Sequence, residues 1–279
     1  MHEVDLGTVR IRYRESGEGP PVVFVHGLLA NSRLWRKVVP TVAEAGFRCV
    51  VPDWPLGAHE VPAPNADLTP PGVAALIDRF LAALELTDVT VVANDTGGAL
   101  TQILMANHPE RLGRVVLTPS DSFERFFPPV FAALPRLARV PGGEWLLGQT
   151  LRARRLLRAT GLAWVAKHPI PEDVLDSYLL PSSQRDPAIR RDLGRFLAAV
   201  DKRHTLTAAT KLSGFSRPVL LAWATEDKHF PMSLARRLAD ILPNAELREI
   251  GDSYTFVPED QPAELAAMVV DFLRTHAAT

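Results

Sequence analysis

Short apolar runs alternate along this chain with longer segments whose apolar residues recur at helical spacing. The runs with the length and composition of β-strands are Val9–Arg14, Pro21–Val25, Arg48–Val51, Val89–Val92, Arg114–Thr118, Pro218–Trp223 and Ala245–Ile250. The segments with helical spacing include residues 32–42, 69–84, 232–242 and 262–273. Strands that alternate with helices form βαβ units, so the pattern predicts an α/β fold: a mostly parallel central sheet with helices on both faces.

The alternation stops between residues 120 and 216, where the pattern is helical throughout. Within this stretch, residues 151–158 mix arginines with leucines. We interpret them as an exposed amphipathic helix and not as a nucleic-acid patch, because the total charge of the chain is close to zero. The sequence therefore predicts a core built from residues 1–119 and 217–279, interrupted by an inserted helical lid (cap) at residues 120–216.

Composition narrows the functional classes. The chain has 279 residues, 47% of them hydrophobic, and a formal net charge of −1 at pH 7, which favours no nucleic-acid partner. No stretch has the ~18 apolar residues of a membrane span, and Met1–Asp5 lack the pattern of a secretory signal. The single Cys49 is predicted to be a buried thiol. We expect a cytoplasmic monomer or homodimer that acts on a small molecule, with no metal site and no cofactor.

The segment Val91–Leu100 carries the most specific signal. A β-branched strand ends at the small residue Ala93, Asp95 follows, and two glycines open a helical run. A tight strand–turn–helix needs small residues on both sides of its apex, because bulk there would clash. A carboxylate at such an apex is a nucleophile that forms an alkyl ester without the help of a base. The alternative role of Asp95 is a helix N-cap.

On these residues the chain resembles the alpha/beta hydrolases over nearly its whole length. Its elbow is similar to that of the haloalkane dehalogenase and epoxide hydrolase branch, which uses Asp as nucleophile. The matching features are His26-Gly27 after the strand at 21–25, the elbow Asn94–Gly98, the helical insertion, and Asp227 after the strand at 218–223. The resemblance implies that Asp95 and Asp227 are catalytic and that the backbone N–H groups of Leu28 and Thr96 form an oxyanion hole. It also implies that His26 shapes the oxyanion loop and is not a base.

The chain departs from this family at several positions. The dehalogenases bind the leaving halide through N–H donors of side chains where this chain has Leu28 and Thr96, which offer none. Epoxide hydrolases protonate the opening ring with lid tyrosines, and the predicted lid holds only Tyr178, either as an acid or as a packed side chain. The catalytic His after the last strand is replaced near Thr255, and neither Thr255 nor its neighbour Tyr254 is a base near pH 7.

Two further residues are expected near the site. His229 follows Asp227 by two positions, at the carboxyl edge of the sheet, and either faces the pocket or lies on a surface loop. Asp121 follows the strand at 114–118, where some dehalogenases place their acid, and takes that role or caps the first lid segment.

Without a His at position 255, Asp227 has lost the partner that the family gives it. We predict that it pairs with a nearby donor or else has a raised pKa. The donors within reach in the sequence are Tyr254, Thr255, Lys228 and His229.

Three functions stay open at this point. The first is a cofactor-independent, hydrolase-like enzyme for a small, largely apolar substrate, with Asp95 as nucleophile or base and slow hydrolytic turnover because the His is missing. The second is a non-hydrolytic enzyme of the same fold, such as a cyclase, lyase or isomerase. The third is a ligand-binding protein that has lost turnover. The fold cannot separate them, because one fold hosts many chemistries.

Overall fold

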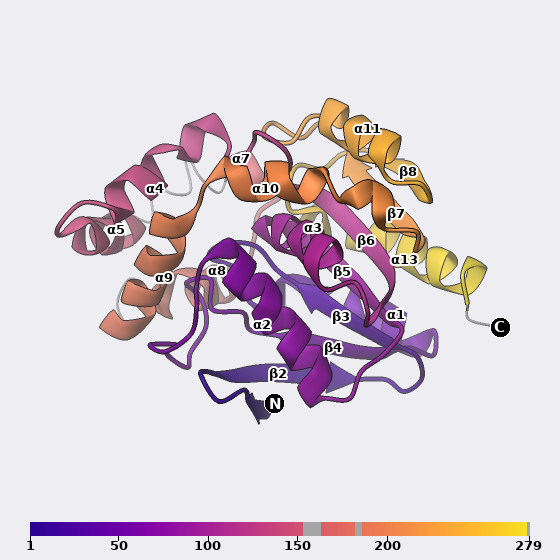
Figure 1. The fold of residues 1–279 in the computed structure, drawn as a ribbon, viewed down its shortest axis with the longest axis horizontal. Coiled ribbons are helices and arrows are strands. Elements are labelled where there is room, and N and C mark those ends of the chain that lie inside the picture. Colours follow the sequence, from indigo (N-terminus) through magenta and orange to yellow (C-terminus); the bar gives the residue numbers. More distant parts are fainter. Residues whose placement is uncertain (153–162, 182–185, 278–279) are drawn as a thin grey trace.

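The computed structural model describes residues 1–152, 163–181 and 186–277 (Figure 1). Within them, one eight-stranded sheet has the order β1-β2-β4-β3-β5-β6-β7-β8. The strands are β1 (His2–Asp5), β2 (Arg10–Ser16), β3 (Pro21–Val25), β4 (Arg48–Pro52), β5 (Val89–Asp95), β6 (Leu112–Ser120), β7 (Val219–Ala224) and β8 (Ala245–Ile250). β1 and β2 pair antiparallel, as do β2 and β4, and all other neighbours are parallel. The predicted α/β fold with a mostly parallel sheet is confirmed.

Helices cover both faces of the sheet, and the period-two alternation of the strands divides the core between them. On β3 and β5, Val23 and Val91 pack with α2 (Pro70–Ala83), α3 (Thr96–Asn107) and α11 (Met232–Ile241). The alternate residues Phe24 and Val92 pack with α1 (Val39–Glu44) and α13 (Pro262–Thr275) on the opposite face. Burial on both faces explains why these strands are continuous apolar runs.

The helix predicted over residues 32–42 is wrong as a single element. A 3₁₀ turn η1 (Ser32–Trp35) is followed by the separate helix α1, in whose first turn Pro40 lies. Proline lacks the N–H that a continuous helix needs there, so it begins a new helix. The capping side chain is also not Ser32: Asn31 Oδ1 accepts the N–H of Arg33.

The described part of the insertion between β6 and β7 contains helices and no named strand. Its elements are η2 (Pro129–Phe131), α4 (Ala133–Ala138), α5 (Gly143–Arg152), α7 (Ala163–Val165), α8 (Glu172–Leu180), α9 (Pro187–Ala199), α10 (Lys202–Ala209) and η5 (Leu212–Gly214). In Figure 1, α4, α5 and α9 lie together on one side of the sheet, whereas α10 lies along α3. Most of the amphipathic helix predicted at 151–158 lies outside the described residues.

Among the described residues, no helix has the length and apolar character needed to cross a membrane. Cys49 on β4 is fully buried, as its apolar sequence context predicts.

Candidate active site

The turn from β5 to α3 places Asp95 at its apex. Asp95 has φ 55° and ψ −132°, a conformation that non-glycine residues seldom adopt. The next turn of chain packs very close to β3: a Cβ at Gly97 would lie 2.4 Å from the carbonyl oxygen of Val25. Only glycine fits there, so the strained geometry at Asp95 is held by the packing of α3 against the neighbouring strand.

The loop after β3 lies directly against the Asp95 carboxylate. A Cβ at Gly27 would be 2.1 Å from Asp95 Oδ2, so no other residue fits beside it. The backbone N–H groups of Leu28 and Thr96 both bond to the carboxylate and lower its pKa. Desolvation outweighs them and, with the nearby charge of Asp227, raises the pKa of Asp95 to about 6. Two backbone N–H groups thus converge on one carboxylate.

His26 holds this loop in place. Its ring lies fully buried, with Nδ1 donating to the carbonyl oxygen of Gly27 at 2.9 Å and Nε2 accepting the N–H of Trp54 at 2.8 Å. Burial lowers the pKa of His26 to about 4, so the ring is neutral at pH 7. Both nitrogens are used in fixing the loop, which leaves neither free for proton transfer.

Asp95 opens onto a cavity of about 420 Å³ whose walls are almost entirely apolar. The core side supplies Leu28, Leu29, Thr96 and Phe256, and the insertion supplies the aromatic residues Phe127, Phe131, Trp164 and Tyr178 together with leucines and valines. Of these aromatic residues, sequence reasoning singled out Tyr178 and missed Phe127, Phe131 and Trp164. In the sequence they are apolar residues of the insertion that follow no clear helical face. Only the position of the cavity shows that they line it.

A second carboxylate, that of Asp121, lies next to the elbow. Thr96 Oγ1 donates to Asp121 Oδ2 at 3.1 Å, and Asp121 is fully buried. Burial raises the pKa of Asp121 well above its ordinary value, and the charge of Asp95 raises it further. Of its two candidate roles, helix cap and site carboxylate, the geometry puts the side chain at the site.

Asp227 lies in the turn after β7 and is partly buried. Its Oδ1 accepts the backbone N–H groups of His229 at 2.6 Å and Phe230 at 2.7 Å. The hydroxyl of Thr255 faces the carboxylate and lowers its pKa, but burial dominates and raises the pKa of Asp227 to about 6. Of the donors predicted for Asp227, His229 therefore bonds through its backbone N–H, whereas Thr255 Oγ1 affects the pKa of Asp227 without forming a hydrogen bond to it.

The other two predicted donors do not contact Asp227 in this arrangement. Lys228 Nζ lies 4.0 Å above the centre of the Tyr254 ring, so the two side chains pair with each other.

Residues 20–262 match the family model described as alpha/beta hydrolase fold. The chain belongs to this family. A haloalkane dehalogenase from Mesorhizobium japonicum is 29% identical over 279 residues, which cover 94% of this chain and 87% of the relative. A cis-3-alkyl-4-alkyloxetan-2-one decarboxylase from Shewanella oneidensis is 24% identical over 282 residues, covering 95% of this chain and 85% of the relative.

A similar solved structure is that of the haloalkane dehalogenase DbeA from Bradyrhizobium elkani USDA94. It is 22% identical, with a TM-score of 0.83, and the match covers 99% of this chain and 97% of that chain. The structural likeness concerns the fold. Together with the sequence relatives, it identifies a hydrolase-like member of the family related to the haloalkane dehalogenases.

In this alpha/beta hydrolase, the segment that replaces the expected His is firmly held. Thr255 is fully buried, and its carbonyl oxygen accepts Asn94 Nδ2 at 2.7 Å. The next residue, Phe256, donates its N–H to the carbonyl oxygen of Val165 at 2.7 Å. The first bond ties the segment to the elbow strand and the second ties it to the insertion.

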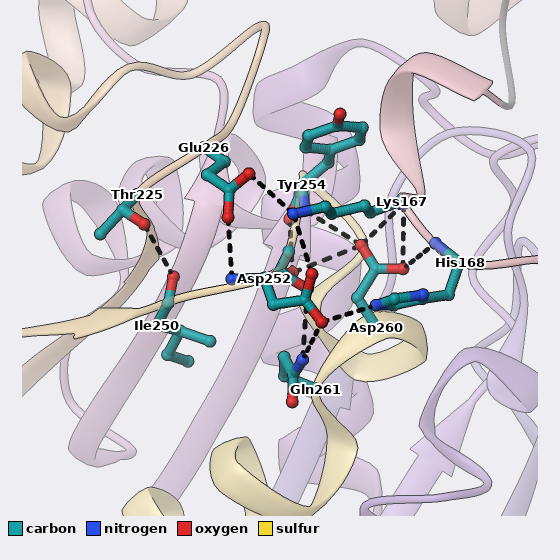
Figure 2. Close-up of polar contacts among 10 residues, drawn as sticks. Lys167, His168, Thr225, Glu226, Ile250, Asp252, Tyr254, Asp260 and Gln261 are labelled. Atoms are coloured by element: carbon teal, nitrogen blue, oxygen red, sulfur yellow. Dashed lines mark hydrogen bonds and ion pairs between the residues drawn. The ribbon is translucent and has the colours of Figure 1, made fainter.

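Figure 2 shows a polar network that fixes the same segment at the surface. The Asp260 carboxylate accepts the backbone N–H groups of Lys167, His168 and Tyr254 at 2.9–3.0 Å. Lys167 Nζ and His168 Nε2 pair in turn with Asp252, at 2.8 and 3.0 Å. The segment after β8 and the part of the insertion that lines the cavity are therefore joined.

The two remaining candidates are His229 and Tyr178. The His229 ring lies among aromatic side chains, 5.3 Å from Phe131 and 6.4 Å from Trp164 between ring centres. Burial and the positive charges of Lys228 and Arg125 lower the pKa of His229.

Tyr178 lines the cavity, but its hydroxyl is engaged elsewhere. It lies 3.4 Å from Glu259 Oε1, and Glu259 also pairs with Arg36 and Lys37. Burial raises the pKa of Tyr178 well above its ordinary value, which makes it a poor proton donor.

Within residues 1–152, 163–181 and 186–277, no three His, Cys, Asp or Glu side chains are grouped in a way that could hold a metal ion.

Proposed function

We propose that this protein binds a small, largely apolar electrophile under a lid formed by residues 120–216, and that Asp95 attacks it to form a covalent alkyl ester. The observation that supports this most directly is the position of Asp95. Its carboxylate lies at the floor of the apolar cavity and receives the N–H groups of Leu28 and Thr96. An apolar pocket with one convergent polar group is the usual form of a small-molecule site.

The first step needs only residues that the site provides. An Asp95 oxygen attacks a saturated carbon of the substrate, the bond from that carbon to its leaving group breaks, and the leaving group departs with the electron pair. Alkyl halides, epoxides and strained lactones all supply such a carbon. The cavity orients the carbon chain by apolar contact, and proximity replaces a bimolecular encounter.

The second step, hydrolysis of the ester, is expected to be slow. In the family a His activates the water, and Thr255 occupies that position here. Removing a positioned base typically lowers a rate by a factor on the order of 10²–10⁴. The ester on Asp95 should therefore accumulate to a level that an intact-protein mass measurement detects.

Intact-protein mass after incubation with alkyl halide, epoxide and lactone panels tests the proposal. The expected result is a mass increase in the wild type that is absent in Asp95→Asn and maps to the peptide that contains Asp95. Asp53→Asn is the matched control, because Asp53 is a buried carboxylate with a raised pKa outside the cavity. Absence of an adduct with every electrophile would contradict the proposal, as would an adduct that persists in Asp95→Asn.

A second candidate, non-hydrolytic acid–base chemistry, is favoured by one observation. The buried carboxylates of Asp121 and Asp227 both influence the titration of Asp95 or are influenced by it. Such a cluster retains a proton near neutral pH and can pass it to and from a substrate. The relative from Shewanella oneidensis, named as a decarboxylase, suits this alternative. Turnover of a lactone without a detectable ester, abolished in Asp95→Asn, would favour it.

A further inference from the structure

Two buried polar atoms at the position of the missing His have no hydrogen-bond partner among the described residues: Asp227 Oδ2 and Thr255 Oγ1. Asp227 Oδ1 is fully used by two backbone N–H groups, so Oδ2 is the oxygen left for another contact. Unpaired buried polar atoms are costly, and native proteins commonly satisfy them with an internal water. The two atoms belong to the same small region, because the Thr255 hydroxyl acts on the titration of Asp227.

This region also reaches the nucleophile. Asn94, the residue before Asp95, donates to the carbonyl oxygen of Thr255 at 2.7 Å, and Asp95 and Phe256 line the same cavity. The charge of Asp227 also raises the pKa of Asp95. By contrast, the His229 ring packs against Phe131 and Trp164, and burial together with the positive charges of Lys228 and Arg125 lowers its pKa.

We propose that Asp227 acts directly as the general base in the hydrolysis of the Asp95 ester, and that the Thr255 hydroxyl helps to hold the attacking water against Asp227 Oδ2. This inference rests on the proposed function, since it concerns the fate of the ester formed there. It assigns to Asp227 a contact with the reacting water, where the family's acid contacts only a His.

The step balances without any other reagent. The water oxygen bonds to Cγ of the Asp95 ester while one water proton moves to Asp227 Oδ2. The negative charge on the ester oxygen is held by the N–H groups of Leu28 and Thr96. When the tetrahedral intermediate collapses, the ester C–O bond breaks, and the leaving alkoxide takes the proton from Asp227. The products are an alcohol, the carboxylic acid of Asp95 and the carboxylate of Asp227. The second water proton, left on Asp95, is then released to solvent, which restores both carboxylates.

Electrostatic coupling between Asp95 and Asp227 favours an ionised Asp227 at the hydrolysis step. While Asp95 is ionised, its charge opposes that of Asp227, because the interaction between two titrating groups is reciprocal. Esterification removes the charge of Asp95. Asp227 then loses this repulsion and is held as a carboxylate by Arg125 and the two backbone N–H groups. A larger fraction of Asp227 is therefore ionised, and able to accept a proton, at the step that requires a base.

A single-turnover measurement tests the inference. Protein is first alkylated with the electrophile that gives the adduct in the wild type, excess reagent is removed, and loss of the adduct is followed by intact mass. Asp227→Asn should still form the adduct but lose it at least about 100-fold more slowly, as expected for removal of a general base. Asp53→Asn, the buried control, should lose it at the wild-type rate. Formation of the adduct itself reports that Asp227→Asn is folded.

Thr255→Val keeps the shape of the side chain and removes its hydroxyl. It should slow loss of the adduct several-fold and leave its formation unchanged. In water enriched in heavy oxygen, one turnover of the wild type should place the label in the Asp95 carboxylate, because the water attacks Cγ.

The outcomes separate the two proposals. An adduct that clears from Asp227→Asn at the wild-type rate overturns this inference and leaves the proposed function standing. So does an adduct trapped in His229→Ala while Asp227→Asn clears it. Failure of wild type and Asp227→Asn alike to form any adduct overturns the proposed function, and the inference with it.

Discussion

The nucleophile side of the site, formed by Gly27, Leu28, Asp95 and Thr96, contrasts with the base side, formed by Asp227 and Thr255. On the nucleophile side, both N–H donors meet the carboxylate, and a glycine makes room for it. On the base side, the outer carboxylate oxygen and the hydroxyl both lack a partner among the described residues. The two sides of the site are positioned by different strands: Gly27 follows β3 and Asp95 ends β5, whereas Asp227 and Thr255 come after β7 and β8. One side can therefore be complete while the other is not.

The largest effect should come from the nucleophile side. Gly27→Ala would put a methyl group against Asp95 Oδ2, so the carboxylate or the oxyanion loop must move. We expect adduct formation to fall by a factor on the order of 10²–10³, comparable to loss of an oxyanion donor. Gly251→Ala is the matched control, since a Cβ there meets nothing within 4 Å. Equal adduct rates in the two variants would show that the loop is not part of the site.

The next effect concerns stability on the base side. The folded pKa of Asp227 is raised from 3.8 to about 6, so its contribution to stability is present below pH 3.8 and is lost as the pH rises through about 6. Asp227→Asn removes the buried charge and should raise the free energy of unfolding at pH 8 by up to about 3 kcal/mol. Urea unfolding at pH 8 and pH 4 measures this. The gain should shrink at pH 4, and a gain of equal size at both pH values would point to packing instead.

Restoring the family's base should sharpen the contrast. Thr255→His places an imidazole between Asp227 and the ester, and we expect turnover to rise about 10-fold or more while adduct formation changes little. Rapid-quench mass measurements separate the two rates. Fast steady turnover of halide or epoxide by the wild type would contradict the premise that the base side is deficient.

The smallest effect is a pH dependence of the first step. Asp95 must be ionised to attack, and its pKa is raised to about 6, so adduct formation should fall as the pH drops through 6. Below that value the rate should decrease roughly 10-fold per pH unit, as for a single required carboxylate. Initial rates of adduct formation between pH 5 and 8 give the profile. A flat profile would mean that Asp95 is not the attacking group.

The fold and the elbow could be predicted from the sequence, because each depends on residues that are close together in the chain. Apolar runs and helical spacing define the strands, and the glycines around Asp95 define the turn. Where a side chain points depends instead on contacts across the chain. Tyr178 meets Glu259 far along the sequence, and the His229 ring packs on Phe131 of the insertion. The residue spacing around Tyr178 or around His229 does not predict such distant partners.

The single helix predicted over residues 32–42 failed for a different reason. The apolar positions keep helical spacing across residues 32–42, but Pro40 starts a new helix within them.

The anchoring of the segment after β8 has a consequence for how this site can change. Asn94, Val165 and the Asp260 network hold the backbone on both sides of Thr255 without using its side chain. We therefore expect that the side chain at position 255 can be exchanged while the surrounding backbone keeps its position. Under the proposed mechanism, a single substitution at position 255 would separate a protein that releases its covalent intermediate slowly from one that releases it fast.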